Sequence, residues 1–297
     1  MSRATMERVE MKLTEIGSLP TIPTLLVPLL QHLCEPAAEV SIDRVVKIIS
    51  QDPALAAQCL RMVNSPLFGM RYPVSTVRGA VMGLGVDRVR QAAMACSLLK
   101  AFAPRGAVRV RALWAHSLAV AMVAQKLSQE AGYPEPEQAY SAGLLHDLGI
   151  LLALTACPAE FESATQAASR NHRALHLCER ELSGFDHCEI GAMLARQWQF
   201  PALYHPVLRY HHEVEQAPEH RCLVAIVSLC DLLCRLRNLG YGFEEIGLVD
   251  LASEPAWAIA ADELPRLRNF DLARFTMELD VFITEVEQSV AALFELV

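Results

Sequence analysis

Long apolar runs are missing from this chain of 297 residues. No uncharged apolar stretch reaches the roughly 18 residues that a membrane-spanning helix needs. The N-terminal stretch MSRATMERVEMKLTEIG has no apolar signal core. The nine cysteines form no CxxC pair and no regular framework, and several stand among apolar residues, as small buried hydrophobes do. These absences predict a cytoplasmic protein without a membrane segment.

Positive charge is also scarce. The chain has 26 basic and 34 acidic residues and a formal net charge of −8. Nucleic acids and anionic lipids need basic patches on their partners. The densest basic group consists of Arg105, Arg109 and Arg111, a spacing that is typical of a solvated face. We therefore expect neither a nucleic-acid partner nor a membrane partner.

Runs of alternating β-branched residues are absent as well, and helical periodicity dominates the chain. Asp52 is placed to cap a helix that begins at Pro53, and Gly85 is placed to end the next one. Asp186 followed by Glu189 is typical of a capping box. With 53% hydrophobic residues the chain can bury a sizeable core. The sequence therefore predicts an all-α fold, a helical bundle.

The best internal boundary is FAPRG, residues 102–106. We predict an N-terminal helical subdomain over 1–105 that packs on a second helical subdomain over 106–238. Within the remaining segment, 239–297, residues 239–265 have the composition of loop and short turns. An amphipathic helix ends the chain, and it either docks on the body or pairs with a second copy in a homodimer.

The run YSAGLLHDLGILLAL, residues 140–154, places His146 and Asp147 side by side within one predicted helix over 136–156. A buried carboxylate is costly unless a charge, hydrogen bonds or a metal compensates it. Four other predicted helices carry further ionisable residues, which are His116, His187, His211, His212 and Asp231.

Residues from facing helices of a bundle can converge on one cavity, and metal sites in helical proteins are built in this way. Imidazole and carboxylate together suit Fe, Mn, Zn or similar divalent ions. Six or seven ligands exceed the need of a single ion. We therefore predict a site for one or two divalent ions, with a two-metal site as the natural inference and Asp147 as its bridge.

Each histidine also has a simpler interpretation. His116 could be a hydrogen-bonded core histidine, and His187 could be a solvated helix start. His211 and His212, near a helix C-terminus, could interact with the helix dipole without any metal.

Asp231 is harder to explain without a metal, because leucines and a cysteine flank it. Its charge could instead be met by Arg235, one helical turn further on. The scattered histidines are interpreted as surface or structural residues; they are His32, His172, His176, His205 and His220.

The order of these residues, His, His-Asp, His, His and Asp, resembles the HD-domain superfamily of metal-dependent phosphohydrolases. It is most similar to the two-metal members, such as the HD-GYP phosphodiesterases and the di-iron oxygenase branch. By position, the resemblance implies one metal on His116, His146, Asp147 and Asp231, and a second on Asp147, His187 and either His211 or His212.

The first half of the chain refines the family. LPTIPTLLVPLLQHL, IISQDPALAAQCLRMVNSPLFGM and VSTVRGAVMGLGVDRVRQAAM resemble the HDOD family, the HD-related output domain of bacterial signalling proteins. The resemblance covers roughly residues 13–235. It implies an all-α fold, with an HD-like second subdomain, and regulatory roles near cyclic-nucleotide or two-component pathways. Many members have lost the HD ligands and are thought to act as binding or scaffolding modules, whereas this chain keeps them.

The chain also departs from the HD-GYP pattern. Ile150 stands where that family has a lysine that meets substrate phosphate, and HHEVEQAPEHR replaces its Gly-Tyr-Pro loop. The GYP at 132–134 precedes the His-Asp pair and is a coincidence. Apart from Arg209 and Arg221, the ligand segments lack basic residues suited to phosphate.

We therefore expect a signalling module that binds a protein partner or a small nucleotide ligand. The alternative is a metal-dependent phosphohydrolase that acts on a nucleotide or cyclic nucleotide. Di-iron redox or oxygen chemistry is a third use of the same ligands.

Overall fold

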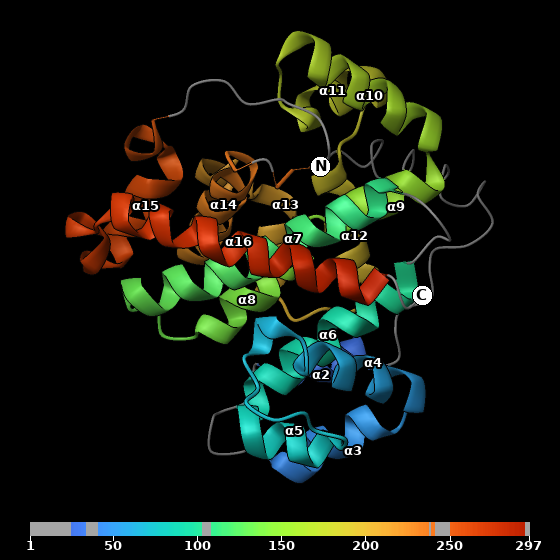
Figure 1. Cartoon of the computed structure of the whole chain (residues 1–297). Coiled ribbons are helices and arrows are strands. Elements are labelled where there is room, and N and C mark those ends of the chain that lie inside the picture. The colour runs from blue at the N-terminus through green and yellow to red at the C-terminus, as the bar shows by residue number, and fades with distance from the viewer. Residues whose placement is uncertain (1–24, 34–40, 103–107, 238, 241–249, 295–297) are drawn as a thin grey trace.

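The computed structural model describes residues 25–33, 41–102, 108–237, 239–240 and 250–294, and all regular structure in them is helical (Figure 1). The all-α prediction is confirmed. The N-terminal helices, blue to teal in Figure 1, are α2 (Leu26–Leu33), α3 (Ile42–Ser50), α4 (Pro53–Val63), α5 (Val77–Leu84) and α6 (Val86–Phe102). The predicted divisions after residues 105 and 238 fall at or beside segments outside the described residues, and they stay predictions.

The predicted helix caps are present. The Asp52 carboxylate accepts hydrogen bonds from the backbone N–H groups of Ala54 (3.0 Å) and Leu55 (3.1 Å) at the start of α4. Gly85 ends α5 with a φ of 88°, a backbone region that favours glycine. Because these caps satisfy helix-terminal groups locally, they fix where the N-terminal helices begin and end.

The helices of the second predicted subdomain, which position the ionisable residues, follow in the chain. They are α7 (Val108–Ala131), α8 (Pro136–Leu145), α9 (Leu148–Ala156), α10 (Pro158–Asn171), α11 (Leu175–Ser183), α12 (His187–Gln197), α13 (Tyr204–Tyr210) and α14 (Arg221–Arg235). Helix α7 packs against α8 and α14, and α12 packs against α9 and α13. Gly143 lets α8 approach α7 closely, since a Cβ there would lie 2.8 Å from the Ala121 backbone.

The single helix predicted over 136–156 is wrong, because the chain breaks between α8 and α9 at His146 and Asp147. Asp147 has a φ of −102° and a ψ of 19°, in the sparsely populated bridge region. No glycine or proline marks this break, and the apolar pattern continues through it.

The loop predicted over 239–265 is wrong for its second part. Helix α15 (Pro255–Glu263) forms there, between the 3₁₀ turns η4 (Leu251–Ser253) and η5 (Pro265–Asn269). It buries Ala256 and Ala260 and packs against α14. Residues 241–249 lie outside the described residues. The helix is short, and its stability comes from this tertiary contact, which a local pattern does not reveal.

The C-terminal helix α16 (Leu272–Phe294) docks on the body of the same chain. Phe275, Leu279, Ile283 and Val286 are buried. The helix contacts α7, α4 and the 3₁₀ turn η2 (Pro66–Phe68), and in Figure 1 it crosses the molecule as the red helix. It therefore ties the N-terminal helices to the rest. A homodimer stays a prediction.

Other sequence expectations can be placed on the structure. The eight described cysteines are buried and none of them is in a disulfide. Among the described residues, no single helix has the length and apolarity to cross a membrane, and one bent pair, Pro136–Leu154 with Pro158–Asn171, meets those measures together. Of the predicted basic group, Arg111 is exposed, whereas Arg105 and the side chain of Arg109 lie outside the described residues.

The contact between α9 and α12 gives the first testable prediction. A Cβ on Gly149 would lie 1.8 Å from the carbonyl oxygen of His187, so no side chain fits without moving α12. We expect Gly149→Ala to lower the free energy of unfolding by about 3 kcal/mol, measured by urea denaturation.

Gly191→Ala is the matched control at the same contact. Its Cβ would meet the Leu208 side chain at an ordinary 3.5 Å. We expect it to leave stability unchanged or to raise it by up to about 1 kcal/mol, since alanine favours the helix. Equal effects of the two substitutions would contradict the close approach.

Candidate metal centre

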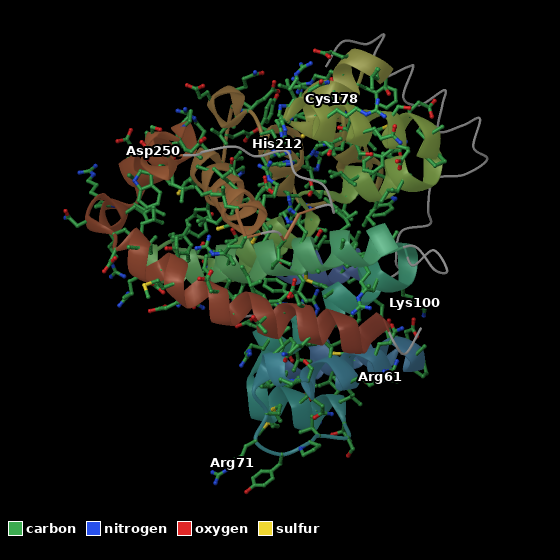
Figure 2. The ribbon with its side chains drawn as sticks, turned by 45° about the horizontal axis from the view of Figure 1, so that its top comes forward. Arg61, Arg71, Lys100, Cys178, His212 and Asp250 are labelled. Carbon is green, nitrogen blue, oxygen red and sulfur yellow. The ribbon has the colours of Figure 1, made fainter. Side chains whose placement is uncertain are left out.

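All seven predicted ligands lie in one cluster, and six of them are fully buried. They come from α7, the break between α8 and α9, the first residue of α12, the end of α13 and the middle of α14. None of the six is more than 1% exposed; they are His116, His146, Asp147, His187, His211 and Asp231. The seventh, His212, has a side chain that is 9% exposed, and Figure 2 shows it amid the helices of the C-terminal half.

The Asp147 carboxylate lies between two pairs of histidines. Its Oδ2 is 3.0 Å from Nε2 of His146 and 3.5 Å from Nε2 of His116. Its Oδ1 is 3.4 Å from Nε2 of His211 and 3.7 Å from Nε2 of His187. Each oxygen thus faces its own pair, which is the arrangement that a bridging carboxylate needs.

The opposite ring nitrogen of each of these histidines is held by the protein. A carbonyl oxygen accepts only, so each Nδ1 that faces one carries the proton and leaves Nε2 as the inward-facing donor to a metal. The three backbone contacts are His116 to Leu239 (2.6 Å), His146 to Gly143 (2.7 Å) and His211 to Val207 (2.9 Å).

His187 is held by a carboxylate that no sequence pattern marks. Oε2 of Glu179, on α11, lies 2.6 Å from Nδ1 of His187 and accepts a hydrogen bond of 3.0 Å from its backbone N–H. Glu179 is 5% exposed. Its setting, CERELS, is typical of a solvated helix face, so no local signal marks it. Carboxylate–histidine pairs of this kind orient metal ligands and raise their basicity.

Asp231 has two kinds of partner. Arg235 donates to it twice, from Nε to Oδ1 at 3.0 Å and from a terminal nitrogen to Oδ2 at 2.8 Å. Nε2 of His116 also lies 3.1 Å from Oδ1. The arginine that offers a metal-free explanation is therefore in place, while the same carboxylate faces the histidine cluster. A ligand role for Asp231 stays a prediction.

The electrostatics favour an ionised carboxylate at the centre. Burial acts to raise the pKa of Asp147, but His146, His211 and His187 hold it well below its usual range. Burial likewise opposes a charge on His211, yet Cys188 and Asp147 raise its pKa to about 10. The negative charge therefore demands positive charge nearby, from protons on imidazoles or from a cation.

The donor set fits divalent ions. Nε2 of His146 and Nε2 of His187 are buried, and within the described part of the chain neither makes a hydrogen bond, although buried polar atoms generally do. Metal–nitrogen and metal–oxygen bonds of about 2.1 Å place neighbouring ligand atoms about 3.0–3.4 Å apart. The distances from Asp147 to the four histidines, 3.0–3.7 Å, lie close to that spacing.

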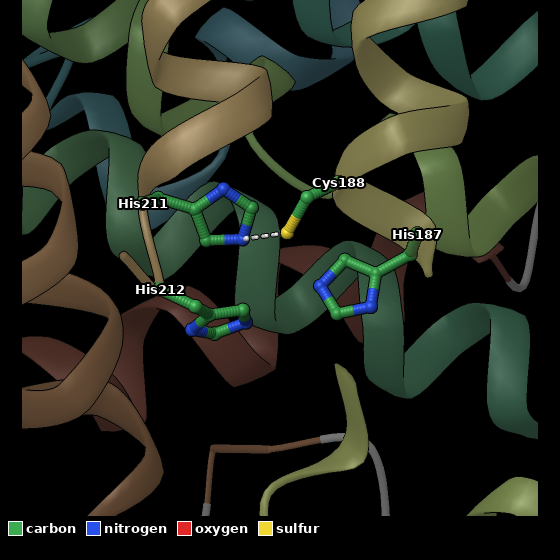
Figure 3. A group of neighbouring side chains, drawn as sticks. All are labelled: His187, Cys188, His211 and His212. Atoms are coloured by element: carbon green, nitrogen blue, oxygen red, sulfur yellow. Dashed lines mark hydrogen bonds between the residues drawn. The ribbon is translucent and has the colours of Figure 1, made fainter. Parts of the chain in front are cut away.

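Two further residues lie at the cluster that the sequence analysis did not assign to it. His176, which we took for a surface or structural residue, is buried and stacks on His212 with a centroid distance of 4.6 Å. Burial lowers the pKa of His176 to about 3. Cys188 lies with its Sγ 3.8 Å from Nε2 of His211 (Figure 3).

The other scattered histidines are apart from this cluster. His172 and His220 are exposed, and His205 is half-buried with Nε2 3.0 Å from the Phe200 carbonyl oxygen. The side chain of His32 lies outside the described residues.

The family follows from comparison with known proteins. The model of the HDOD domain matches residues 19–214. This chain belongs to the HDOD family. A crystal structure of an HDOD domain protein of unknown function from Geobacter sulfurreducens is 31% identical, with a TM-score of 0.85 over 98% of each chain. A candidate phosphohydrolase from Shewanella amazonensis SB2B shares the fold, with 24% identity and a TM-score of 0.70 over 95% of this chain and 97% of that one.

An uncharacterized protein of Treponema pallidum (strain Nichols) is 27% identical over 237 residues. The match covers 78% of this chain and 45% of that protein, so this HDOD chain spans less than half of that relative's length.

Glu179 gives the second prediction. Removal of a residue that hydrogen-bonds to a metal ligand lowers the metal affinity by about 10–100-fold. We expect that loss for Glu179→Gln, measured as competition for Zn²⁺ with a chromophoric chelator. Glu181→Gln is the matched control, because Glu181 lies on the same helix and pairs with Arg173 at the surface (2.6 Å). Equal affinities in the two variants would show that Glu179 does not support a metal ligand.

Proposed function

We propose that this chain is an HDOD signalling module that holds two divalent ions in a closed site and acts by binding a partner or a ligand. The observation that supports this most is the burial of the cluster, whose six central side chains are at most 1% exposed. A hydrolase needs a vacant metal position that substrate can reach. A site enclosed by its own ligands suits a structural or sensory ion better.

Two residues near the cluster agree with a role without turnover. Ile150, at the position where the HD-GYP family has its phosphate lysine, is 1% exposed and packs in the hydrophobic core. Arg235 points its guanidinium at Asp231 and neutralises a ligand candidate instead of facing solvent as a phosphate clamp.

A pocket between α12 and α13 supports the binding of a small ligand. It has a volume of about 240 Å³ and lies where α12 and α13 meet the segment before α14. Its polar lining consists of Arg196, His205, Arg209, Tyr210 and one carboxylate, that of Glu219. Arginine and tyrosine together suit an anionic, planar ligand such as a nucleotide. Because Arg209 and Tyr210 directly precede His211, an occupant would lie close in the chain to the cluster.

The metal itself gives the third prediction. We expect protein purified without chelators to contain about two first-row metal ions per chain by elemental analysis. Ions that join five helices stabilise the folded state, by about 2.7 kcal/mol when the free ion is at a hundred times its Kd. Removal of the ions should therefore lower Tm, and His146→Ala should reduce the metal content. Metal-free protein whose Tm is unchanged by His146→Ala would contradict the proposal.

A phosphohydrolase is the second candidate, and the two-sided placement of Asp147 favours it. When bound, a pair of ions supplies the Lewis acidity that phosphoester hydrolysis uses. In this chain Asp147 would hold both ions, the four histidines would fix their positions, and the buried cluster would exclude bulk water.

The fourth prediction separates the two functions. We expect metal-loaded protein to release no product from a panel of cyclic and linear nucleotides, measured by chromatography. Asp147→Asn is the control, because product that forms without the metal site would still be released in this variant. Turnover that is lost in Asp147→Asn would establish the hydrolase and reject the module without turnover.

A further inference from the structure

The space between the start of α12 and the end of α13 holds four potential ligands, one of which is a thiol. Ligand atoms of His187, Cys188, His211 and His212 lie within 4.8 Å of one another. Figure 3 shows the Cys188 sulfur and the three imidazoles around a common point. Two adjacent residues can reach this point because side chains lean toward the N-terminus of their helix, and His187 and Cys188 begin α12.

We propose that Cys188 is a thiolate ligand of the second metal position, together with the imidazoles of His187, His211 and His212 and the bridging carboxylate of Asp147. The inference rests on the proposed function, because it assumes that ions occupy the cluster. It adds a soft ligand to a set otherwise made of imidazole and carboxylate. The position would then take Zn²⁺ or Fe²⁺ in preference to Mn²⁺ or Mg²⁺, since thiolates favour softer ions.

The sulfur lies at the distance that a shared ion requires. Metal–sulfur and metal–nitrogen bonds of about 2.3 and 2.1 Å at a tetrahedral angle place S and N about 3.6 Å apart. The distance from Sγ of Cys188 to Nε2 of His211 is 3.8 Å. Nε2 of His187, which faces the same space, is buried without a hydrogen bond. Nε2 of His187 is thus a second potential ligand atom at this metal position, independent of Cys188.

The surroundings of Cys188 differ from those of most of the buried cysteines. Six of the eight described cysteines, Cys59 among them, belong to the contiguous hydrophobic core of the described residues, whereas Cys157 and Cys188 do not. Cys188 is nevertheless only 1% exposed. A thiol enclosed by ring nitrogens is not a small core hydrophobe. Without a metal the contact to His211 is a weak hydrogen bond, and this is the alternative that the experiment has to separate.

Cobalt substitution of the full chain is the test and the fifth prediction. We expect metal-free protein titrated with Co²⁺ to develop visible d–d bands and a near-ultraviolet sulfur-to-cobalt charge-transfer band. Cys188→Ala should lose the charge-transfer band, and Cys59→Ala, which removes a core thiol, should keep it. The Zn²⁺ affinity of Cys188→Ala should fall by at least about tenfold, since even outer-shell partners contribute 10–100-fold. Its Mn²⁺ affinity should change little.

The outcomes separate this inference from the proposed function. Visible cobalt bands without the charge-transfer band in the unmodified chain would overturn thiolate ligation and leave the metal site standing. No cobalt binding at all would overturn both. X-ray absorption at the zinc edge of the unmodified protein decides independently of any variant: one sulfur neighbour supports the proposal, and only nitrogen and oxygen neighbours reject it.

Discussion

The structure depends on the burial of one carboxylate. Asp147 is 1% exposed, and an anion in that setting is tolerable only when its neighbours compensate it. The fold supplies the compensation from both sides, with one pair of imidazoles on each oxygen. The carboxylate lies at the break between α8 and α9, where Asp147 has non-helical backbone angles. This placement requires the close contact at Gly149 that brings the start of α12 against α9.

The hydrogen bonds behind the four histidines make the arrangement depend on each of its members. Each Nδ1 of the four histidines around Asp147 is held by a carbonyl or a carboxylate, so the rings cannot rotate to find other partners. A buried polar network of this kind stabilises one packing when it is complete and destabilises it when a member is missing. Glu179 extends the network to α11, which contributes no ligand of its own to the predicted set. Helix α11 therefore matters to the site although it carries none of the predicted ligands.

Much of the fold and most of the cluster could be predicted from the sequence, and the failures have physical causes. The caps at Asp52 and Gly85 depend on local hydrogen bonds and backbone angles, so the residue types at these positions predict them. The convergence of the predicted ligands could be expected, because ionisable residues within apolar helices need compensating partners from neighbouring helices. The α8–α9 break and α15 depend on tertiary contacts that leave no mark in local periodicity. The sequence analysis singled out neither Glu179 nor Cys188, because the role of each is set by the residue that faces it across the bundle.

The short helix α13 connects the pocket for the proposed ligand with the proposed metal cluster. Its seven residues carry Arg209 and Tyr210 in the pocket lining, and His211 and His212 follow directly. A pocket occupant that shifts α13 would change the affinity for the ions, and by reciprocity the ions would change the affinity for the occupant by the same factor. Couplings of about 1–3 kcal/mol are typical between linked sites. If the chain is the binding module that we propose, ion occupancy would set how tightly the bundle holds α13, the helix that the ligand would touch.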